Sequence, residues 1–522
     1  SVLFGAEASS AVIQMFTERG DPEARRPHGS LVYERGSFST DHWTAALNGG
    51  LADRLDDAFT SDQFRTTGEF PNDAFRITSG TANVGLRLSN QTQLRAIYRT
   101  FDSYTGAPGQ VQYGFINYDA NETARDSTVS VRLDDTRGQR FTQRALLGYH
   151  RYRDRFSDTN SEMYSYGAVF QLNSFPDTRA YFERMIPFSA TDSEPGTAVV
   201  KGFETLFAFP GLTYTNRTSA SYQGTLSQRG GALVFGYEYE RQAGQISATN
   251  VDRSNNGVFV HEQYALTSRI FVTGGVRVEH SSTFGAKFTP RGAITFRLPA
   301  DTYLRLSLAR GIKEPALIEN FARESFYVGN PNLKPEKTDS FEAGLSREWF
   351  GRRVRTEASY FRNRFTDRIE FDFSSFPSTW QNIARSRSRG VELSASVKLA
   401  SFVTARASFT KLYTRNIANS PDVELIRRPR NAGTISLELA PRRWTVVAGA
   451  RVVGERPDDD FVFGVINRAN GYEDVFVSAS WQATRHVEPF VRVNNALNER
   501  YAETLGYSAL SRAALGGVRL SW

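Results

Sequence analysis

The sequence predicts an all-β protein, a transmembrane antiparallel β-barrel of about 22 strands. Three observations support this fold class. Apolar and polar residues alternate along strand-length segments, arginines recur in the middle of these segments, and the connections between them are alternately short and long. The composition agrees, because aromatic residues make up 13% of a chain in which hydrophobic residues make up only 40%. Abundant Phe and Tyr at modest hydrophobicity suit strands that are apolar on one face only.

Alternation is clearest in the segment 403–411. There Val403, Ala405, Ala407 and Phe409 alternate with Thr404, Arg406, Ser408 and Thr410. Successive side chains of a strand point to opposite faces, so we expect the first set to face lipid and the second to face a wet lumen. The same period of two recurs in 303–309 and in the last residues, where Val518, Leu520 and Trp522 are separated by Arg519 and Ser521.

Strand length and mid-strand arginines separate this pattern from that of a soluble β-sandwich, which also alternates. Arg305 and Arg406 lie in the middle of their segments, where a water-filled interior accepts a guanidinium. The segments are on the order of 10 residues long, the length that crosses a bilayer at a tilt. No stretch approaches the roughly 18 consecutive apolar residues that a membrane helix needs.

The connections set the strand count and predict two different rims. Tight turns are expected at Asn90–Thr92, Arg229–Gly231, Ala300–Asp301, Gly351–Arg353, Arg442–Arg443 and Thr484–His486. Longer segments are expected at Tyr104–Ser127, Asp158–Arg217, Ser247–Gly257, Ala316–Lys337, Ala418–Pro429 and Phe463–Gly471. Short turns on one rim and long loops on the other are typical of outer-membrane barrels. Counting in this way gives about 22 strands from Ser30 to Trp522, whereas 16 or 18 would indicate a porin.

The residue inventory argues against several other functions. The chain has no Cys, so disulfides and thiolate metal sites are excluded. Its six His residues are scattered, no phosphate-binding loop or serine elbow occurs, and the net charge of +7 is spread along the chain. The acidic run Asp458–Asp460 is interpreted as a solvated loop in preference to a cation site. We therefore expect no enzymatic activity, cofactor, metal or nucleic acid.

One stretch near the middle carries a family resemblance. Ala309–Gly344 reads ARGIKEPALIENFARESFYVGNPNLKPEKTDSFEAG, in which Asn330–Glu336 leads into a new strand. Pro331 and Pro335 fix φ and bias the residues before them to extended forms, which guides a loop back to the sheet. This stretch resembles the most diagnostic segment of TonB-dependent outer-membrane receptors.

Both ends of the chain resemble the same family. Ser1–Gly20, SVLFGAEASSAVIQMFTERG, is similar to the closing segment of the family's plug domain, although Ser9 and Ser10 stand where paired glycines are usual. Near the other end Val493–Tyr501, VNNALNERY, resembles the penultimate-strand signature, and the chain stops on the aromatic Trp522. The resemblance divides the chain into residues 1–28, the end of a plug domain, and residues 29–522, the receptor barrel.

The resemblance to this family implies an active importer in the outer membrane of a Gram-negative bacterium. The expected partners are TonB, which would contact a segment upstream of Ser1, a scarce small ligand, and outer-membrane lipid and lipopolysaccharide around a monomeric barrel. A passive porin-like channel and a structural or adhesive barrel are the alternatives from other classes. A porin has no plug domain, whereas Ser1–Gly20 resembles the end of one. An adhesin needs an exposed passenger domain.

Within the family, the last hundred residues look most like cobalamin receptors. LIRRPRN at Leu425–Asn431, GERPDDDF at Gly454–Phe461 and the pair Gly506–Tyr507 match loops that reach the ligand there. The resemblance implies that Arg427, Phe461 and Tyr507 face the ligand. The arginine would donate to an amide or phosphate, and the two aromatic rings would pack against the apolar rim of a corrinoid. Siderophore receptors share the Arg-Arg-Pro pattern, so a ferric siderophore is the alternative ligand.

Overall fold

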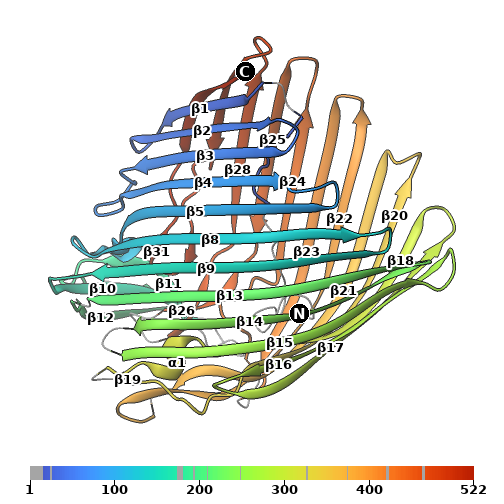
Figure 1. The fold of residues 1–522 in the computed structure, drawn as a ribbon. Coiled ribbons are helices and arrows are strands. Elements are labelled where there is room, and N and C mark those ends of the chain that lie inside the picture. Colours follow the sequence, from blue (N-terminus) through green and yellow to red (C-terminus); the bar gives the residue numbers. More distant parts are fainter. Residues whose placement is uncertain are drawn as a thin grey trace.

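The fold is a closed antiparallel barrel, seen in a computed structural model (Figure 1). The structure describes residues 16–23, 26–172, 180–191, 194–208, 210–246, 249–324, 327–372, 374–418, 423–460 and 465–522. Within these residues the main sheet has 23 strands, of which the two-residue β19 (Tyr327–Val328) pairs in parallel with the first two residues of β22. The other 22 form the barrel, so the predicted fold class and strand number are confirmed.

The barrel strands follow one another in chain order. They are β1 (His28–Gly36), β2 (Thr40–Leu51), β3 (Leu55–Thr66), β4 (Phe75–Arg87), β5 (Thr92–Gly106), β8 (Asn121–Arg137), β9 (Phe141–Ser157), β13 (Gly211–Gln228), β14 (Gly231–Ile246), β15 (Thr249–Ala265), β16 (Ile270–Ser281), β17 (Gly285–Leu298), β18 (Thr302–Lys313), β20 (Glu336–Trp349), β21 (Val354–Asp372), β22 (Ser378–Ala400), β23 (Val403–Asn416), β24 (Asn431–Leu439), β25 (Trp444–Val453), β28 (Tyr472–Trp481), β29 (Val487–Asn494) and β32 (Ala513–Ser521). The ring closes where β1 pairs antiparallel with β32, from Ser30↔Ser521 to Gly36↔Leu515.

The register of β23 agrees with the predicted alternation. Ala405 and Ala407 pair with Leu437 and Ile435 of β24, and Phe409 pairs with Leu393 of β22, which makes one continuous apolar face. On the opposite face Arg406 forms an ion pair with Glu438 at 2.7 Å, and Ser408 shares a hydrogen bond with Thr434. Paired residues of an antiparallel ladder share a face, so the polar set continues around the ring as the lumenal surface.

The two rims differ as the sequence predicts. One end, the turn rim, carries short turns such as those between β8 and β9 and between β22 and β23. The other end, the loop rim, carries the segments 107–120, 158–210, 314–335, 417–430, 454–471 and 495–512. One prediction is wrong: most of the predicted loop Ser247–Gly257 is strand, because residues 249–257 belong to β15, which begins at Thr249 and pairs with β14.

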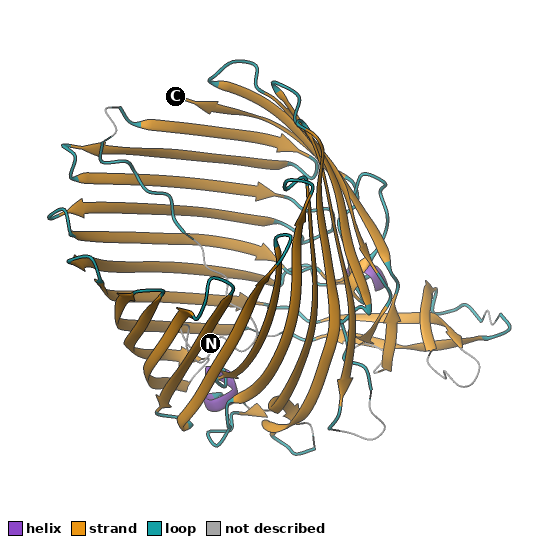
Figure 2. Ribbon diagram, turned by 90° about the vertical axis from the view of Figure 1, so that its right-hand side faces the viewer, coloured by secondary structure: helices purple, strands orange, loops and turns teal. Residues whose placement is uncertain are grey.

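Small elements give the loop rim a structure of its own. The segment 158–210 contains a three-stranded sheet of β10 (Glu162–Leu172), β11 (Ala180–Ile186) and β12 (Thr197–Leu206), which projects from the barrel at the right of Figure 2. Aromatic residues of β10 pack against Tyr113 and Phe115 from the segment 107–120 in a buried cluster. That segment also holds β6 (Gly109–Gln110), the 3₁₀ helix η1 (Val111–Tyr113) and β7 (Phe115–Ile116).

The remaining short elements complete this rim. They are α1 (Leu317–Phe321), β26 (Arg456–Asp460), β27 (Val465–Ala469), β30 (Ala502–Thr504) and β31 (Tyr507–Ser508). Among the described residues no helix is long and apolar enough to span a bilayer.

The residues of the motif Asn330–Glu336 hold their loop against strand β22. Leu333 is buried, the Asn330 amide donates to the carbonyl of Trp380 at 3.0 Å, and the Lys334 N–H donates to the Asn382 side chain at 2.8 Å. Asn382 in turn donates to the Lys334 carbonyl at 2.9 Å. The motif therefore fastens the loop between β18 and β20 onto β22, in the register that the two prolines favour.

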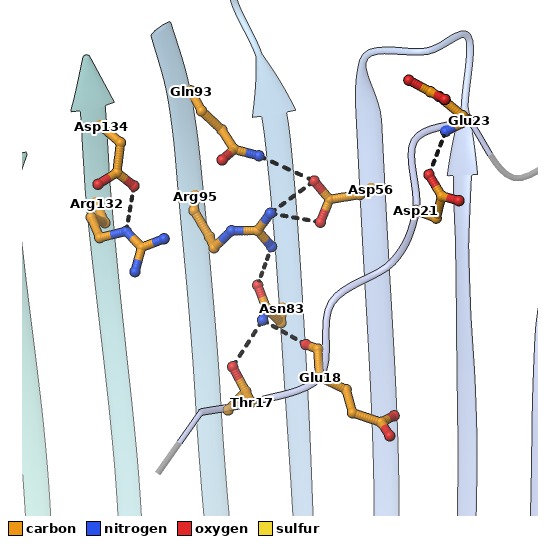
Figure 3. A network of polar contacts seen from close by, with 10 residues as sticks. All are labelled: Thr17, Glu18, Asp21, Glu23, Asp56, Asn83, Gln93, Arg95, Arg132 and Asp134. Carbon is orange, nitrogen blue, oxygen red and sulfur yellow. Dashed lines mark hydrogen bonds and ion pairs between the residues drawn. The ribbon is translucent and has the colours of Figure 1, made fainter. Parts of the chain in front are cut away.

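The described part of the N-terminal segment runs along the lumenal face of the first strands (Figure 3). The Asn83 amide of β4 donates to the Thr17 hydroxyl at 2.8 Å and to the Glu18 carbonyl at 2.7 Å. The outward face of the same strands exposes Leu47, Phe59 and Tyr98. Residues 16–20 form no strand and the barrel seam lies between β1 and β32. Most of the plug-like motif, Ser1–Met15, lies outside the described residues.

Candidate ligand site at the loop rim

A cavity of about 690 Å³ lies at the loop rim, where three loops meet. Gln110 comes from the loop between β5 and β8, Arg427 from the loop between β23 and β24, and the rest from the loop between β29 and β32. The lining residues are Gln110, Arg427, Glu503, Thr504, Leu505, Tyr507, Ser508 and Ala509. The structure thus brings together two of the three residues predicted to face a ligand, Arg427 and Tyr507.

Tyr507 is presented by a tight hairpin formed by β30 and β31. The turn needs glycine because Gly506 has a φ of 89°, and a Cβ there would lie 3.0 Å from the Gln110 side chain. Two hydrogen bonds dock the turn on the neighbouring loop: the Gly506 N–H donates to Gln112 Oε1 at 2.9 Å, and the Gln112 N–H donates to the Gly506 carbonyl at 2.9 Å. The Tyr507 side chain remains about half exposed, with 49% of its surface accessible.

The base of this loop explains the motif VNNALNERY. Asn495 is buried and its amide donates to the carbonyls of Glu499 and Leu510 at 2.9 and 3.1 Å. Tyr501 stacks on Tyr472 of β28, with ring centroids 3.9 Å apart. The motif is therefore structural, because it fixes the two ends of the loop that carries Tyr507.

Arg427 occupies a turn that its neighbours hold in place. Its φ of 57° is unusual for a residue with a side chain. Its N–H donates to the Pro457 carbonyl at 2.7 Å, and its Nε donates to Asp458 Oδ1 at 2.7 Å. The guanidinium is anchored at one edge while the side chain stays 46% exposed at the cavity.

Asp458 is the central residue that sequence reasoning missed. It is fully buried, at 0% exposure, so the interpretation of Asp458–Asp460 as a solvated loop is wrong for this residue. Its Oδ2 accepts the Leu505 N–H at 2.9 Å while Oδ1 holds Arg427. The carboxylate is buried because it satisfies donors from two other loops, which compensates its desolvation.

Arg456, two residues before Asp458, is the second missed residue. It is buried, and its Nη2 donates to the carbonyls of Ala502 and Glu503 at 2.7 and 2.6 Å. Alternating residues of β26 thus fasten the hairpin that carries Tyr507. The only sequence signal was the motif GERPDDDF itself, which contains both residues.

The ionised groups of the cavity are paired. Glu503 Oε1 accepts from Arg451 Nη2 at 2.6 Å and from the Tyr472 hydroxyl at 2.9 Å. The hydrogen bond from Arg451 holds the pKa of Glu503 below its ordinary value, and the hydrogen bond from Tyr472 lowers this pKa further. The carboxylate therefore stays ionised. Arg427 is paired with Asp458. Each charged residue that lines the cavity therefore has a counter-ion, and the remaining lining offers amide, hydroxyl and aromatic groups.

The third predicted ligand residue, Phe461, lies outside the described residues. The described residues contain no group of three or more His, Cys, Asp or Glu side chains arranged to hold a metal ion.

The barrel matches a known family over most of its length. Residues 50–496 match the family model described as TonB dependent receptor-like, beta-barrel. The chain belongs to this family, which consists of transport receptors and not of enzymes, and whose members are outer-membrane proteins of Gram-negative bacteria.

Two groups of curated relatives share part of the sequence. The vitamin B12 transporter BtuB of Vibrio vulnificus is 24% identical over 384 residues, covering 71% of this chain and 59% of the relative. The protein of the same name from Photobacterium profundum is 23% identical, covering 57% and 49%. An iron-regulated outer membrane virulence protein of Vibrio cholerae is 23% identical, covering 38% and 35%. The chain spans about half the length of the vitamin B12 transporters it matches.

Solved structures show the same fold. The ferric-catecholate import receptor Fiu of Escherichia coli K12 superposes with a TM-score of 0.77 at 13% identity, covering 97% of this chain and 83% of that one. A mutant of the ferric enterobactin receptor PfeA of Pseudomonas aeruginosa, in complex with enterobactin, gives a TM-score of 0.74 at 15% identity, covering 95% of this chain and 81% of that one. At such identities the likeness concerns the fold alone.

Proposed function

We propose that this chain is the barrel and outer mouth of an active transport receptor in the outer membrane, which imports a corrinoid with energy delivered by TonB. Residues 1–28 are the end of a plug, residues 29–522 are the wall, and the chain catalyses no reaction. The lumenal course of residues 16–23 supports the plug assignment. Family membership and the vitamin B12 transporters among the relatives support the transport function.

The observation that carries the ligand proposal is the charge balance of the cavity. Arg427 is neutralised by Asp458 and Glu503 by Arg451, so the lining presents no uncompensated cation. A corrinoid carries carboxamide groups around its rim, which suit Gln110, Thr504 and Ser508 and the remaining donors of Arg427. Tyr507 offers an exposed ring for the apolar part of such a ligand.

A ferric siderophore is the second candidate. The structural neighbours include receptors named for ferric catecholates and ferric enterobactin, which makes this ligand class worth testing directly. A ferric tris-catecholate is anionic, because three doubly deprotonated catechols outweigh Fe³⁺, and it therefore favours a site with excess positive charge. The paired arginine of this cavity argues for the corrinoid.

Ligand binding to the purified protein, expressed from its complete coding sequence, tests the proposal. Titration calorimetry would compare cyanocobalamin with a panel of ferric siderophores. We expect tight binding of cyanocobalamin alone. Tight binding of a siderophore without cobalamin binding would refute the corrinoid proposal and leave the transport proposal standing.

Arg427→Ala should weaken cyanocobalamin binding by about 1.5–3 kcal/mol, the scale of a hydrogen bond to a charged group. The substitution removes the donor that faces the cavity and also removes the ion pair between Arg427 and Asp458. Arg428→Ala is the matched control, because Arg428 is the next residue, is exposed, and does not line the cavity. Binding by Arg427→Ala as tight as that of the control would remove Arg427 from the site.

A further inference from the structure

One buried carboxylate links the two ligand-facing loops of the cavity. Asp458 of β26 does not itself line the cavity, yet Oδ1 holds the Arg427 guanidinium and Oδ2 holds the N–H of Leu505 in the Tyr507 hairpin. We propose that Asp458 determines the charge selectivity of this site: it cancels the charge of Arg427 and so weakens the binding of ligands with net negative charge relative to neutral ones. This inference rests on the proposed function, because it concerns the ligand of the same cavity.

Burial makes Asp458 effective in this role. Its side chain has 0% exposure, against 46% for Arg427, so solvent screens the carboxylate poorly while the guanidinium reaches the cavity. A ligand carboxylate beside Arg427 would also lie near Asp458, and the attraction of one would be offset by the repulsion of the other. A carboxamide meets no such repulsion and can still accept from the Nη groups.

The same carboxylate gives the site its shape. Arg427 also anchors its N–H on the Pro457 carbonyl, next to Asp458, and the Leu505 N–H binds the other carboxylate oxygen. Contacts with the short strand β26 thus fix the positions of both Arg427 and the Tyr507 hairpin. Asp458 acts through these groups and is a positioning residue, while its charge acts on the ligand directly through space.

Asp458→Asn separates charge from shape, because the amide has the same size and keeps one acceptor oxygen. Its oxygen can still accept the Leu505 N–H, but the NH₂ group cannot accept from Arg427, which becomes an uncompensated cation at the cavity. The Arg456 bonds to the carbonyls of Ala502 and Glu503 are untouched and continue to hold the hairpin. The variant should therefore fold with Tyr507 in place.

The test uses two ligands of the same shape and different charge. These are cyanocobalamin and its monocarboxylic acid, in which one peripheral carboxamide is hydrolysed to a carboxylate. Dissociation constants for both would be measured with the purified protein, expressed from its complete coding sequence, and with Asp458→Asn. We expect the affinity ratio of acid to amide to rise about tenfold in Asp458→Asn, the scale of one newly exposed charge near a solvated ligand. High salt should shrink the rise.

Glu455→Gln is the matched control. It removes a negative charge from the same loop, but Glu455 is 60% exposed, pairs with Arg468, and does not line the cavity. The acid-to-amide ratio should stay as in the parent protein. An equal loss of affinity for both ligands in Asp458→Asn, or an unchanged ratio, would overturn the charge role, since a merely structural residue changes affinity without changing charge preference.

Failure of the ligand proposal gives a different result. If the parent protein binds no corrinoid but binds a ferric catecholate, the corrinoid function is wrong. The charge role is then tested on the catecholate itself, whose binding Asp458→Asn should strengthen about tenfold through the freed Arg427. Unchanged or weaker catecholate binding would overturn it.

Discussion

Asp56→Ala should destabilise the barrel by about 3–5 kcal/mol, the cost of leaving a buried charge without its partner. Arg95 of β5 forms an ion pair with Asp56 of β3 on the lumenal wall, in which Arg95 Nη2 donates to the two carboxylate oxygens at 2.7 and 2.8 Å (Figure 3). The Asp56 and Arg95 side chains are only 3% and 2% exposed. Arg95 also donates to Asn83, which holds the Thr17–Glu18 segment. The loss should therefore loosen that segment as well as the wall.

Denaturant unfolding of barrels folded into lipid vesicles, followed by tryptophan fluorescence, measures this effect. Asp102→Ala is the control, because Asp102 belongs to the same strand as Arg95 but pairs with Arg125 on the outward face, where the two side chains are 51% and 74% exposed. An exposed pair should contribute less than about 1 kcal/mol. Replacing both members of the buried pair, as Asp56→Leu with Arg95→Met, should restore most of the stability. If Asp56→Ala cost no more than the control, the buried network would not stabilise the wall.

Ala407→Arg should destabilise the barrel in lipid by about 2–4 kcal/mol, because the new guanidinium would lie on the lipid face near the middle of the bilayer. Ala407 lies between Ala405 and Phe409 on the apolar face of β23, well inside the strand. Ala405→Arg should cost less, since Ala405 is only two residues from the first residue of the strand and closer to the interface.

Ser408→Arg is the control for the face assignment. Ser408 lies next to Ala407 but shares its hydrogen bond with Thr434 on the lumenal face, where Arg406 already resides. Its free energy of unfolding in vesicles should stay close to that of the parent barrel. Equal costs for Ser408→Arg and Ala407→Arg would show that the two faces of β23 are not distinguished by lipid, contrary to the register described here.

The strands could be predicted from sequence because a barrel wall has two chemically different faces. The alternation of β23 and of the C-terminal strand reports this directly, whatever the partner strands are. The prediction failed at Ser247–Gly257, which is rich in Asn, Asp and Ser and suggests a loop. In the structure Arg253 and Asn255 are buried within β15, where Arg253 pairs with Glu314 from a distant loop. A lumenal face accepts polar residues, so polarity there does not mark a turn.

The candidate site could be predicted only in part, for a related reason. Arg427 and Tyr507 stand in loops that resemble ligand-contacting loops, and they do line one cavity. Asp458 escaped prediction because a carboxylate within an acidic run has the same local sequence whether it is solvated or buried. Its burial depends on donors from Arg427 and Leu505, which are 31 and 47 residues away in sequence. Whether Asp458 is solvated or buried therefore depends on how separate loops pack together.

Uptake of labelled cyanocobalamin by intact cells tests the central claim most directly. The protein, expressed from its complete coding sequence, would be produced in a Gram-negative host that lacks its own cobalamin receptor, with and without TonB. We expect accumulation only when both the protein and TonB are present, because a plugged barrel needs energy to pass a large ligand. Accumulation that is equally fast without TonB would indicate a passive channel and contradict TonB-coupled import. A lack of cobalamin accumulation in cells that contain both the protein and TonB would contradict import of cobalamin.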